Sequence, residues 1–330
     1  MQYARFQVAE NSQRGEARRA AAAQAHSLGF DEETAGRIAL VVSELAGNLV
    51  KHVPGGGELF LRSVPRSGTL AIEIVAVDQG PGLGDDQRAM RDGFSTTGTA
   101  GTGLGAVARL SDSFDVYSSP TQGTAIVSRI WRGDPPSEPA VAVGALCATM
   151  LGERVPGDAC SVVDLAGRTR ILLADGLGHG PDAEVAALKA VAVFEADQRT
   201  TIGALLEDIH RALRPTRGAA VSIAEIDPGR RSLQYVGIGN ISATIQSRDN
   251  VRNLVSHNGI VGHMIHRIQE FSYEFPAGSL AVLHSDGLRT RWTLDGYAGL
   301  TRRDPTLVAA VLFRDYQRGR DDATAVVARA

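Results

Sequence analysis

Apolar residues recur at helical spacing in one stretch of the N-terminal third of the chain. Ile38, Val42, Leu45 and Leu49 follow one another at intervals of three or four residues, and this spacing predicts a helix with one apolar face. Asp31 stands just before the stretch, where its side chain can accept hydrogen bonds from the first backbone N–H groups of a helix. The pattern therefore predicts a half-buried helix that begins after Asp31.

Other apolar and polar segments predict a mixture of strands and helices in both halves of the chain. In the N-terminal half the expected strands are at residues 3–9, 58–64, 70–78, 114–118 and 123–131, and further helices at 15–28 and 103–110. In the C-terminal half the expected strands are at residues 141–149, 160–165, 168–174, 219–227, 232–237, 242–246, 270–275, 280–285 and 324–328, and helices at 181–195, 202–214 and 305–313. The fold class expected for both halves is mixed α/β.

A proline-rich segment separates the two halves. Residues 132–139 hold three prolines and one glycine in eight positions, a composition typical of extended and exposed linkers. The chain of 330 residues also exceeds the usual size of a single hydrophobic core. We therefore predict two domains, at residues 1–131 and 140–330, joined by a linker at 132–139.

Composition narrows the classes of function. The formal net charge is −3, and no long run of Lys and Arg is present, so we expect no nucleic-acid binding. The N-terminus lacks the apolar core of a signal peptide, and the longest apolar run, at residues 140–151, is too short to span a membrane. We therefore expect a cytoplasmic protein with no membrane contact, in which Cys147 and Cys160 are buried free thiols.

Polar residues in the N-terminal half form a candidate nucleotide site. Glu44 and Asn48 are four residues apart, so they share one face of the predicted helix and could hold Mg²⁺ and polarise a hydroxyl. Asp78 ends an apolar strand and is followed by Gly80 and Gly82, which would let a flat ligand approach the backbone. The glycine-rich residues 98–105 open a helix whose backbone N–H groups could bind phosphate. Alternatively, Glu44 and Asn48 are ordinary solvated residues and Asp78 only caps a turn.

Together these residues resemble the Bergerat-type ATPase and kinase superfamily, most closely its RsbT-like switch kinases. The segments ELAGNLVKH, VDQGPGLGD and GFSTTGTAGTGLGAVARLSDSFDV match the N-box, the G1 box, and the lid with the G2 box of that superfamily. The resemblance implies a Bergerat-type α/β sandwich that binds ATP with Mg²⁺, with Glu44 as general base, Asn48 as the Mg²⁺ ligand and Asp78 reading adenine. It also places at the nucleotide Gly80, Gly82, Gly101, Gly103, Gly105 and Thr124.

Four aspartates in the C-terminal half lie at or beside the ends of predicted strands. They are Asp158, Asp175, Asp286 and Asp321. Aspartates are costly to bury unpaired, so their convergence would require cations. Oxygen ligands without a Cys/His cluster favour Mg²⁺ or Mn²⁺, and two such ions can activate a bridging water for attack on phosphorus. Each Asp-Gly pair taken alone is more typical of a turn.

This half resembles the metal-dependent type 2C protein phosphatases, specifically their SpoIIE/RsbX-like branch. The segments PGD at 156–158, ADGLGHGPDA, HSDGL and RDDATAVV carry the resemblance. It implies an α-β-β-α sandwich with two Mn²⁺ or Mg²⁺ ions, in which Asp175 bridges the ions and the Gly176 carbonyl binds one of them. Asp158, Asp286 and Asp321 would complete the two coordination shells, with Asp322 behind them. His179 is either a general acid or a turn residue before the following helix, and His284 is expected to pack at a strand end.

The two resemblances together imply a bifunctional partner-switching regulator. It would phosphorylate and dephosphorylate serine or threonine on STAS-domain partner proteins of the anti-sigma antagonist or stressosome type. The alternative keeps the phosphatase and makes the N-terminal domain an ATP-sensing module that captures a partner without phosphorylating it. Because the lid at residues 94–105 has no Lys or Arg, nucleotide binding is better supported than turnover. A homodimer is compatible with the kinase resemblance.

Overall fold

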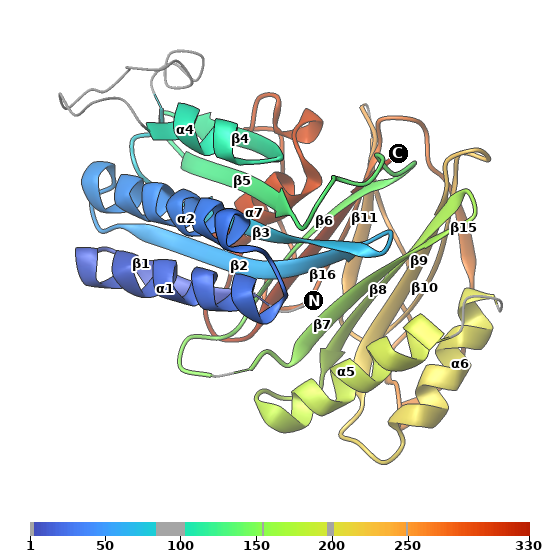
Figure 1. Cartoon of the computed structure of the whole chain (residues 1–330). Helices are drawn as coiled ribbons and strands as arrows, with labels where there is room; N and C mark the ends of the chain where they lie inside the picture. The colour runs from blue at the N-terminus through green and yellow to red at the C-terminus, as the bar shows by residue number, and fades with distance from the viewer. Residues whose placement is uncertain (1–2, 84–102, 154, 197–200, 249) are drawn as a thin grey trace. The chain divides into compact units, whose positions relative to one another are not determined.

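A computed structural model describes residues 3–83, 103–153, 155–196, 201–248 and 250–330 (Figure 1). The chain divides into two compact units. The unit that we call N-terminal contains Tyr3–Ser137 together with Asp295–Arg314, and the unit that we call C-terminal contains Glu138–Leu294 and Asp315–Ala330. The predicted linker falls where the chain passes from one unit to the other, while residues 295–314 fold with a part of the chain far away in sequence. The domain bounds predicted above stay a prediction.

The N-terminal unit is built on one antiparallel sheet with the strand order β1-β2-β3-β5-β4. Its strands are β1 (Ala4–Val8), β2 (Gly57–Arg66), β3 (Thr69–Val77), β4 (Ser113–Ser119) and β5 (Gly123–Trp131). Its helices from this part of the chain are α1 (Asn11–Ser27), α2 (Glu32–His52) and α4 (Gly103–Leu110). Figure 1 shows α1 and α2 side by side across one face of the sheet. The sandwich of helices on a sheet that the sequence predicts is therefore confirmed.

The predicted apolar face of α2 does build this core. Ile38 and Leu45 pack in one cluster with Leu61 of β2 and Ile74 of β3. Asp31 caps the helix as expected, since its side chain accepts a hydrogen bond from the Thr34 N–H at 2.7 Å. Burial of apolar side chains along such a face is the main stabilising contribution for a surface helix.

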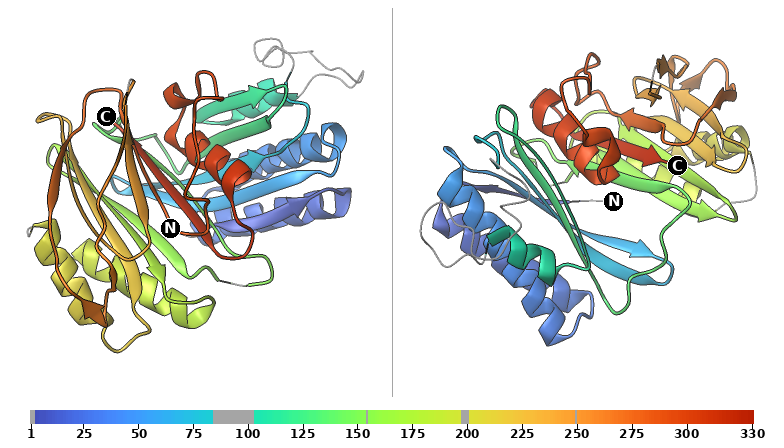
Figure 2. Two further views of the ribbon diagram at one scale, coloured as in Figure 1. Left: turned by 180° about the vertical axis from the view of Figure 1, so that it is seen from behind. Right: turned by 90° about the horizontal axis from the view of Figure 1, so that it is seen from above.

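The C-terminal unit contains two five-stranded sheets, with the orders β15-β10-β9-β8-β7 and β12-β11-β16-β17-β6. The strands are β6 (Ala142–Ala148), β7 (Asp158–Leu165), β8 (Arg168–Gly176), β9 (Ala219–Asp227), β10 (Ser232–Ile238), β11 (Ser242–Gln246), β12 (Val251–Asn253), β15 (Phe271–Glu274), β16 (Leu280–His284) and β17 (Ala323–Arg329). Side chains from both sheets form one core between them. The helices α5 (Pro181–Ala196) and α6 (Ile202–Leu213) cover the outer face of the first sheet (Figure 2).

Short strands are where the sequence prediction and the structure differ most. The strand β12 and the pair β13 (Gly259–Ile260) with β14 (Met264–Ile265) have two or three residues each, too few to show an alternating pattern. The helix α1 also begins four residues before the expected start at residue 15, because the Gln13 side chain accepts hydrogen bonds from the Ala9 and Glu10 N–H groups. In the described part of the chain, no helix is both long and apolar enough to cross a membrane.

Residues 295–314 cover the second face of the N-terminal sheet. They include the 3-10 turn η1 (Leu300–Arg302) and most of α7 (Pro305–Tyr316). Leu59, Leu61 and Ile74 face α1 and α2, so the alternation of side chains along a strand turns Phe60 and Glu73 to the opposite face. There the Phe60 ring meets the Phe313 ring edge to face, with centroids 5.4 Å apart.

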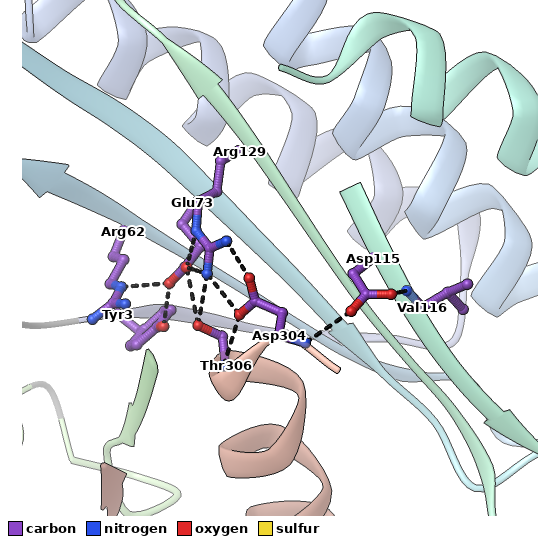
Figure 3. A network of polar contacts seen from close by, with 8 residues as sticks. All are labelled: Tyr3, Arg62, Glu73, Asp115, Val116, Arg129, Asp304 and Thr306. Atoms are coloured by element: carbon purple, nitrogen blue, oxygen red, sulfur yellow. Dashed lines mark hydrogen bonds and ion pairs between the residues drawn. The ribbon is translucent and has the colours of Figure 1, made fainter. Parts of the chain in front are cut away.

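A buried carboxylate ties this segment to the sheet (Figure 3). Glu73 of β3 is fully buried and accepts hydrogen bonds from the Tyr3 hydroxyl, Arg62 Nε and Arg129 Nε at 2.6, 2.6 and 2.7 Å. The Arg129 guanidinium also binds both oxygens of Asp304, at 2.6 and 3.0 Å. Burial alone would raise the pKa of Glu73, but the charges of Arg62 and Arg129 hold it at about 2. The network therefore contains a permanently ionised glutamate at neutral pH.

The first prediction concerns this glutamate. Glu73→Gln should lower the free energy of unfolding of the full chain by about 3–5 kcal/mol at neutral pH, because it leaves two buried guanidinium groups short of a carboxylate. The folded-state pKa of Glu73, about 2, lies below the ordinary value of 4.5. Its stabilising contribution is thus complete above pH 4.5 and disappears as the pH falls toward 2.

Denaturant titrations at several pH values between 7 and 2.5 measure this difference. Glu16→Gln, at an exposed position of α1, is the matched control and should change stability by less than about 0.5 kcal/mol. A gap between wild type and Glu73→Gln that stays constant down to pH 2.5 would contradict the prediction.

Candidate functional site

Strand pairing gathers the predicted metal ligands at one end of the C-terminal sandwich. Asp158 begins β7 and lies directly opposite Asp175, near the end of β8, in an antiparallel pair. Asp286 follows the end of β16, and Asp321 precedes β17, its antiparallel partner. Because antiparallel neighbours place the end of one strand beside the start of the next, the chain delivers two carboxylates from each sheet.

The side-chain alternation explains why these groups point inward. Cys160 of β7 and Leu173 of β8 belong to the core between the two sheets. Asp158 and Asp175 are each two residues away, so they extend from the same inner face. There Asp175 lines a cavity of about 400 Å³ together with Asp286 and Asp321. Asp158 is buried beside it. The convergence predicted from the strand ends is therefore found.

Three of these acids have raised pKa values. Burial raises the pKa of Asp175, and the charges of Asp158, Asp286 and Asp321 raise it further. Burial likewise raises the pKa of Asp158, although a hydrogen bond from the Ser285 hydroxyl at 2.6 Å opposes this. The pKa of Asp321 is also raised, chiefly by burial. Such a cluster favours either protons or cations.

Oxygen donors around this cavity fit hydrated divalent ions. Among the described residues, no three side chains of His, Cys, Asp or Glu form a closed group that could hold a metal ion. Mg²⁺ is commonly bound through only one or two carboxylates and keeps several waters, so it does not need such a group. The repelling carboxylates at a polar cavity therefore suit Mg²⁺ or Mn²⁺, with Asp175, Asp286 and Asp321 best placed to hold them.

Gly176 occupies a tightly packed position beside Asp175. Its N–H donates to the Gly157 carbonyl at 3.0 Å, and a Cβ at this position would lie 2.1 Å from the Ala183 carbonyl oxygen of α5. Only glycine lets the helix approach so closely. The resemblance implied a role for the Gly176 carbonyl as a ligand, and this role stays a prediction.

Two further residues of the predicted motifs hold the surrounding backbone or pack against it. Asp322 accepts hydrogen bonds from the Met150 and Gly157 N–H groups at 2.7 and 2.5 Å, so it fixes the turn that leads into Asp158. His284 is buried, and its Nε2 accepts from the Trp292 indole N–H at 3.0 Å. Its Nδ1 must therefore carry the proton that is shared with the Ser285 carbonyl at 2.8 Å. The expected packing role of His284 is confirmed.

The structure also shows the surroundings of His179 and of the two cysteines. The exposed His179 imidazole lies 2.8 Å from the Glu153 carboxylate and is not among the residues that line the cavity. Its predicted roles, general acid or turn residue, remain untested. Cys147 and Cys160 are both buried free thiols, as expected.

Sequence reasoning missed the amides at the cavity. Asn240 and Asn258 line it beside the acids, and the Asn240 Nδ2 donates to Asp286 Oδ2 at 2.7 Å. The signal that identified the aspartates, a polar residue beside a glycine where an apolar strand ends, is also present at Gly239-Asn240. Applying it to amides as well as acids would have found Asn240.

The candidate nucleotide site lies where β3 ends in the N-terminal unit. Asp78 Oδ1 accepts hydrogen bonds from the Gly80 N–H at 2.8 Å and the Thr124 N–H at 3.2 Å. Asp78 and Thr124 also exchange backbone hydrogen bonds, of 2.9 and 3.2 Å. Burial raises the pKa of Asp78. A Cβ at Gly82 would lie 2.5 Å from the Ser119 carbonyl oxygen, so the turn after Asp78 requires glycine there. Asp78, Gly80 and Thr124 are thus brought together, as the motifs predict.

Other predicted nucleotide residues lie on the helices around this turn. Glu44 and Asn48 are partly buried on one face of α2, and neither side chain makes a hydrogen bond or ion pair with another residue that the structure describes. Gly103 and Gly105 lie in the first turn of α4, which packs against α2. Gly101 and the rest of the predicted lid up to residue 102 lie outside the described residues.

Comparison with protein families assigns each half separately. Residues 8–130 match the family described as "Histidine kinase-like ATPase domain", and residues 166–330 match the family described as "Stage II sporulation protein E (SpoIIE)". The chain is also similar to the serine/threonine-protein kinase RsbT of Bacillus subtilis (strain 168). The two are 40% identical over 107 residues, which cover 32% of this chain and 80% of that protein.

Two solved structures are similar in fold to more than half of the chain. One, described as "The bacterial stressosome: a modular system that has been adapted to control secondary messenger signaling", has 29% identity and a TM-score of 0.55, over 58% of this chain and all of that chain. A second, the crystal structure of RsbX in complex with magnesium, has 19% identity and a TM-score of 0.51, over 58% of this chain and 97% of that one. The second likeness concerns the fold alone.

The second prediction follows from the repulsion among the acids. A carboxyl whose folded-state pKa is raised stabilises the fold while it is protonated, and this contribution is lost as the pH rises through the raised pKa. Without metal, Asp175→Asn should therefore be more stable than wild type by about 1–3 kcal/mol at alkaline pH, and the gain should shrink in mild acid.

Thermal unfolding in EDTA at several pH values from 5 to 9 tests this. Asp164→Asn, at an exposed position of β7, is the control for loss of one negative charge. If Asp175→Asn melts at or below the wild-type temperature throughout this range, the acids do not repel one another as described.

Proposed function

Because the chain belongs to the Stage II sporulation protein E family and, through its N-terminal domain, to the family of the serine/threonine-protein kinase RsbT, we propose that it switches the phosphorylation state of partner proteins. It joins a kinase-like ATPase domain to a phosphatase domain of the type 2C serine/threonine class. One observation carries the proposal. Asp175, Asp286 and Asp321 line a single cavity, where the repulsion between their carboxylates favours a bound cation or a proton.

In the phosphatase reaction, two bound Mg²⁺ or Mn²⁺ ions would supply a deprotonated water and neutralise the phosphoryl oxygens. Asp175, Asp286 and Asp321 would hold these ions, with Asp158 and the Gly176 carbonyl completing the set. The Asn240 amide orients Asp286 through its hydrogen bond of 2.7 Å, and the Ser285 hydroxyl binds Asp158. A phosphoserine dianion is repelled by the metal-free cavity, so substrate binding depends on the same ions as the chemistry.

The N-terminal domain binds ATP with Mg²⁺ in this proposal. The Gly80 and Thr124 N–H groups hold Asp78 Oδ1, which leaves Oδ2 to accept from the exocyclic amine of adenine. Asn48 coordinates Mg²⁺ and Glu44 activates the hydroxyl of the protein substrate. Gly82, Gly103 and Gly105 shape the pocket, and Gly101 is assigned there by its motif. Similarity to RsbT supports kinase activity, and capture of a partner without phosphorylation is the alternative.

We further propose that the substrates are STAS-domain proteins of the anti-sigma antagonist or stressosome type, in the cytoplasm. The likeness to RsbT and to the structure described as part of the bacterial stressosome supports this assignment.

The third prediction tests the phosphatase. The full chain should hydrolyse an aryl phosphate and a phosphoserine STAS protein only with Mn²⁺ or Mg²⁺. Asp175→Asn should reduce the rate roughly 10³-fold or more, because it removes a charge that the ions require, while Asp164→Asn should retain it. Hydrolysis that persists in EDTA and in Asp175→Asn would exclude the two-ion site.

The fourth prediction separates the kinase from the ATP sensor. The Asp175→Asn variant, in which the phosphatase is blocked, should transfer labelled phosphate from ATP to a STAS protein. Adding Glu44→Gln should abolish transfer while ATP affinity, measured by calorimetry, stays within about twofold, because the substitution removes a base and not a nucleotide contact. ATP binding without any transfer would leave the sensing alternative as the function.

A further inference from the structure

The inserted segment ends at the nucleotide site of the N-terminal unit. Residues 295–314 leave the C-terminal unit after Leu294 and the chain returns to it at Asp315. The last residue of the segment, Arg314, is 6% exposed. Its Nη1 donates to the Asp78 carbonyl at 3.3 Å, and its own carbonyl accepts from Gln79 Nε2 at 3.4 Å. Arg314, from the second half of the sequence, therefore contacts the backbone of Asp78, the residue whose carboxylate is proposed to bind adenine.

Arg314 is buried, unlike a typical surface arginine, and lies in a helix that is tied to the N-terminal sheet. It follows Phe313, whose ring packs on Phe60, and it belongs to the helix that follows Asp304, which is bound by Arg129. Thr306 in the first turn of that helix donates to Glu73 at 3.2 Å. A guanidinium fixed in this way can define the position of a backbone carbonyl, because little freedom is lost when the hydrogen bond forms.

The Asp78 turn has little room to adjust. Gly123 has a φ of +82°, and a Cβ there would lie 2.1 Å from the Asp78 carbonyl oxygen. The same oxygen accepts from the Thr124 N–H at 3.2 Å and from Arg314. On the side chain, Oδ1 is engaged by Gly80 and Thr124. The orientation of Oδ2 is thus determined by a turn that Arg314 holds from outside the nucleotide motifs.

We propose that Arg314 is a positioning residue of the nucleotide site, which fixes Asp78 for recognition of the exocyclic amine of adenine. The inference rests on the proposed ATP binding by the N-terminal domain and adds a determinant of base selectivity to it. It also makes residues 295–314 an integral part of the nucleotide-binding unit, so a fragment that ends at the linker would lack them.

Calorimetry on the full chain with Mg²⁺ tests the proposal by comparing ATP with inosine triphosphate, which lacks the exocyclic amine. Arg314→Met should weaken ATP binding about tenfold and leave the affinity for inosine triphosphate within about twofold, so that selectivity between the bases is lost. Arg314→Lys, which keeps the charge and one donor direction, should recover part of the selectivity. Arg302→Met, in the exposed turn η1 of the same segment, is the matched control and should behave as wild type.

A merely structural role gives a different result. Arg314→Met would then lower the melting temperature while the folded protein kept its ratio of ATP to inosine triphosphate affinity, or both nucleotides would weaken equally, and either outcome overturns the proposal. Should Arg314→Met not fold, the ratio measured for Arg314→Lys decides, and a wild-type ratio there overturns it. The variant Asp78→Asn distinguishes failure of the Arg314 proposal from failure of the proposed nucleotide site. If it leaves ATP affinity unchanged, the proposed nucleotide site itself is wrong, whereas loss of selectivity in Asp78→Asn alone rejects only the role of Arg314.

Discussion

A carboxylate withdrawn from water needs a neutralising partner, and this chain meets that constraint in two opposite ways. In the N-terminal unit, Glu73 is surrounded by Arg62 and Arg129, which keep it ionised despite complete burial. In the C-terminal unit, the charges of Asp158, Asp286 and Asp321 raise the pKa of Asp175 along with burial. In the first arrangement, the charge of the buried carboxylate is neutralised by the protein itself. The second leaves the charges of the acids to be neutralised by protons or by cations. The cost of burying a carboxylate is thus offset by arginines in one unit, while in the other it favours the binding of protons or cations.

The compensated carboxylate also explains the topology. The segment Asp295–Arg314 could not remain on the N-terminal sheet through apolar contact alone, because Glu73 and Arg129 occupy the middle of the face that it covers. Asp304 supplies a negative charge to the Arg129 guanidinium, which binds both oxygens of Asp304 as well as Glu73. The polar network therefore specifies which helix covers this face, in a way that nonspecific burial of Phe60 could not.

The sequence was sufficient to predict most of the C-terminal site and much of the N-terminal one. Asp158, Asp175, Asp286 and Asp321 could be grouped in advance because strand ends are visible in the hydrophobic pattern and antiparallel pairing joins them. The location of α7 could not be predicted. Its apolar residues predict a buried helix at residues 305–313. The spacing of apolar residues does not, however, identify the sheet against which a helix packs. Arg314 was missed for the same reason, since its role depends on a contact with a residue more than two hundred positions away.

This topology also changes how a signal could pass between the two activities. A kinase and a phosphatase that act on one phosphosite would cycle wastefully unless a ligand favoured one of them, and a ligand can do so only through different affinities for two arrangements, typically worth about 1–3 kcal/mol. The linker at residues 132–139 offers one covalent route, from β5 to β6. The segment Asp295–Arg314 offers two more, and these lead to the strand ends that carry the acids. Asp286 precedes the segment, and Asp321 follows Arg314 after seven residues. A change in the turn that holds Asp78 is therefore connected to the phosphatase carboxylates by a shorter stretch of chain than the linker alone provides.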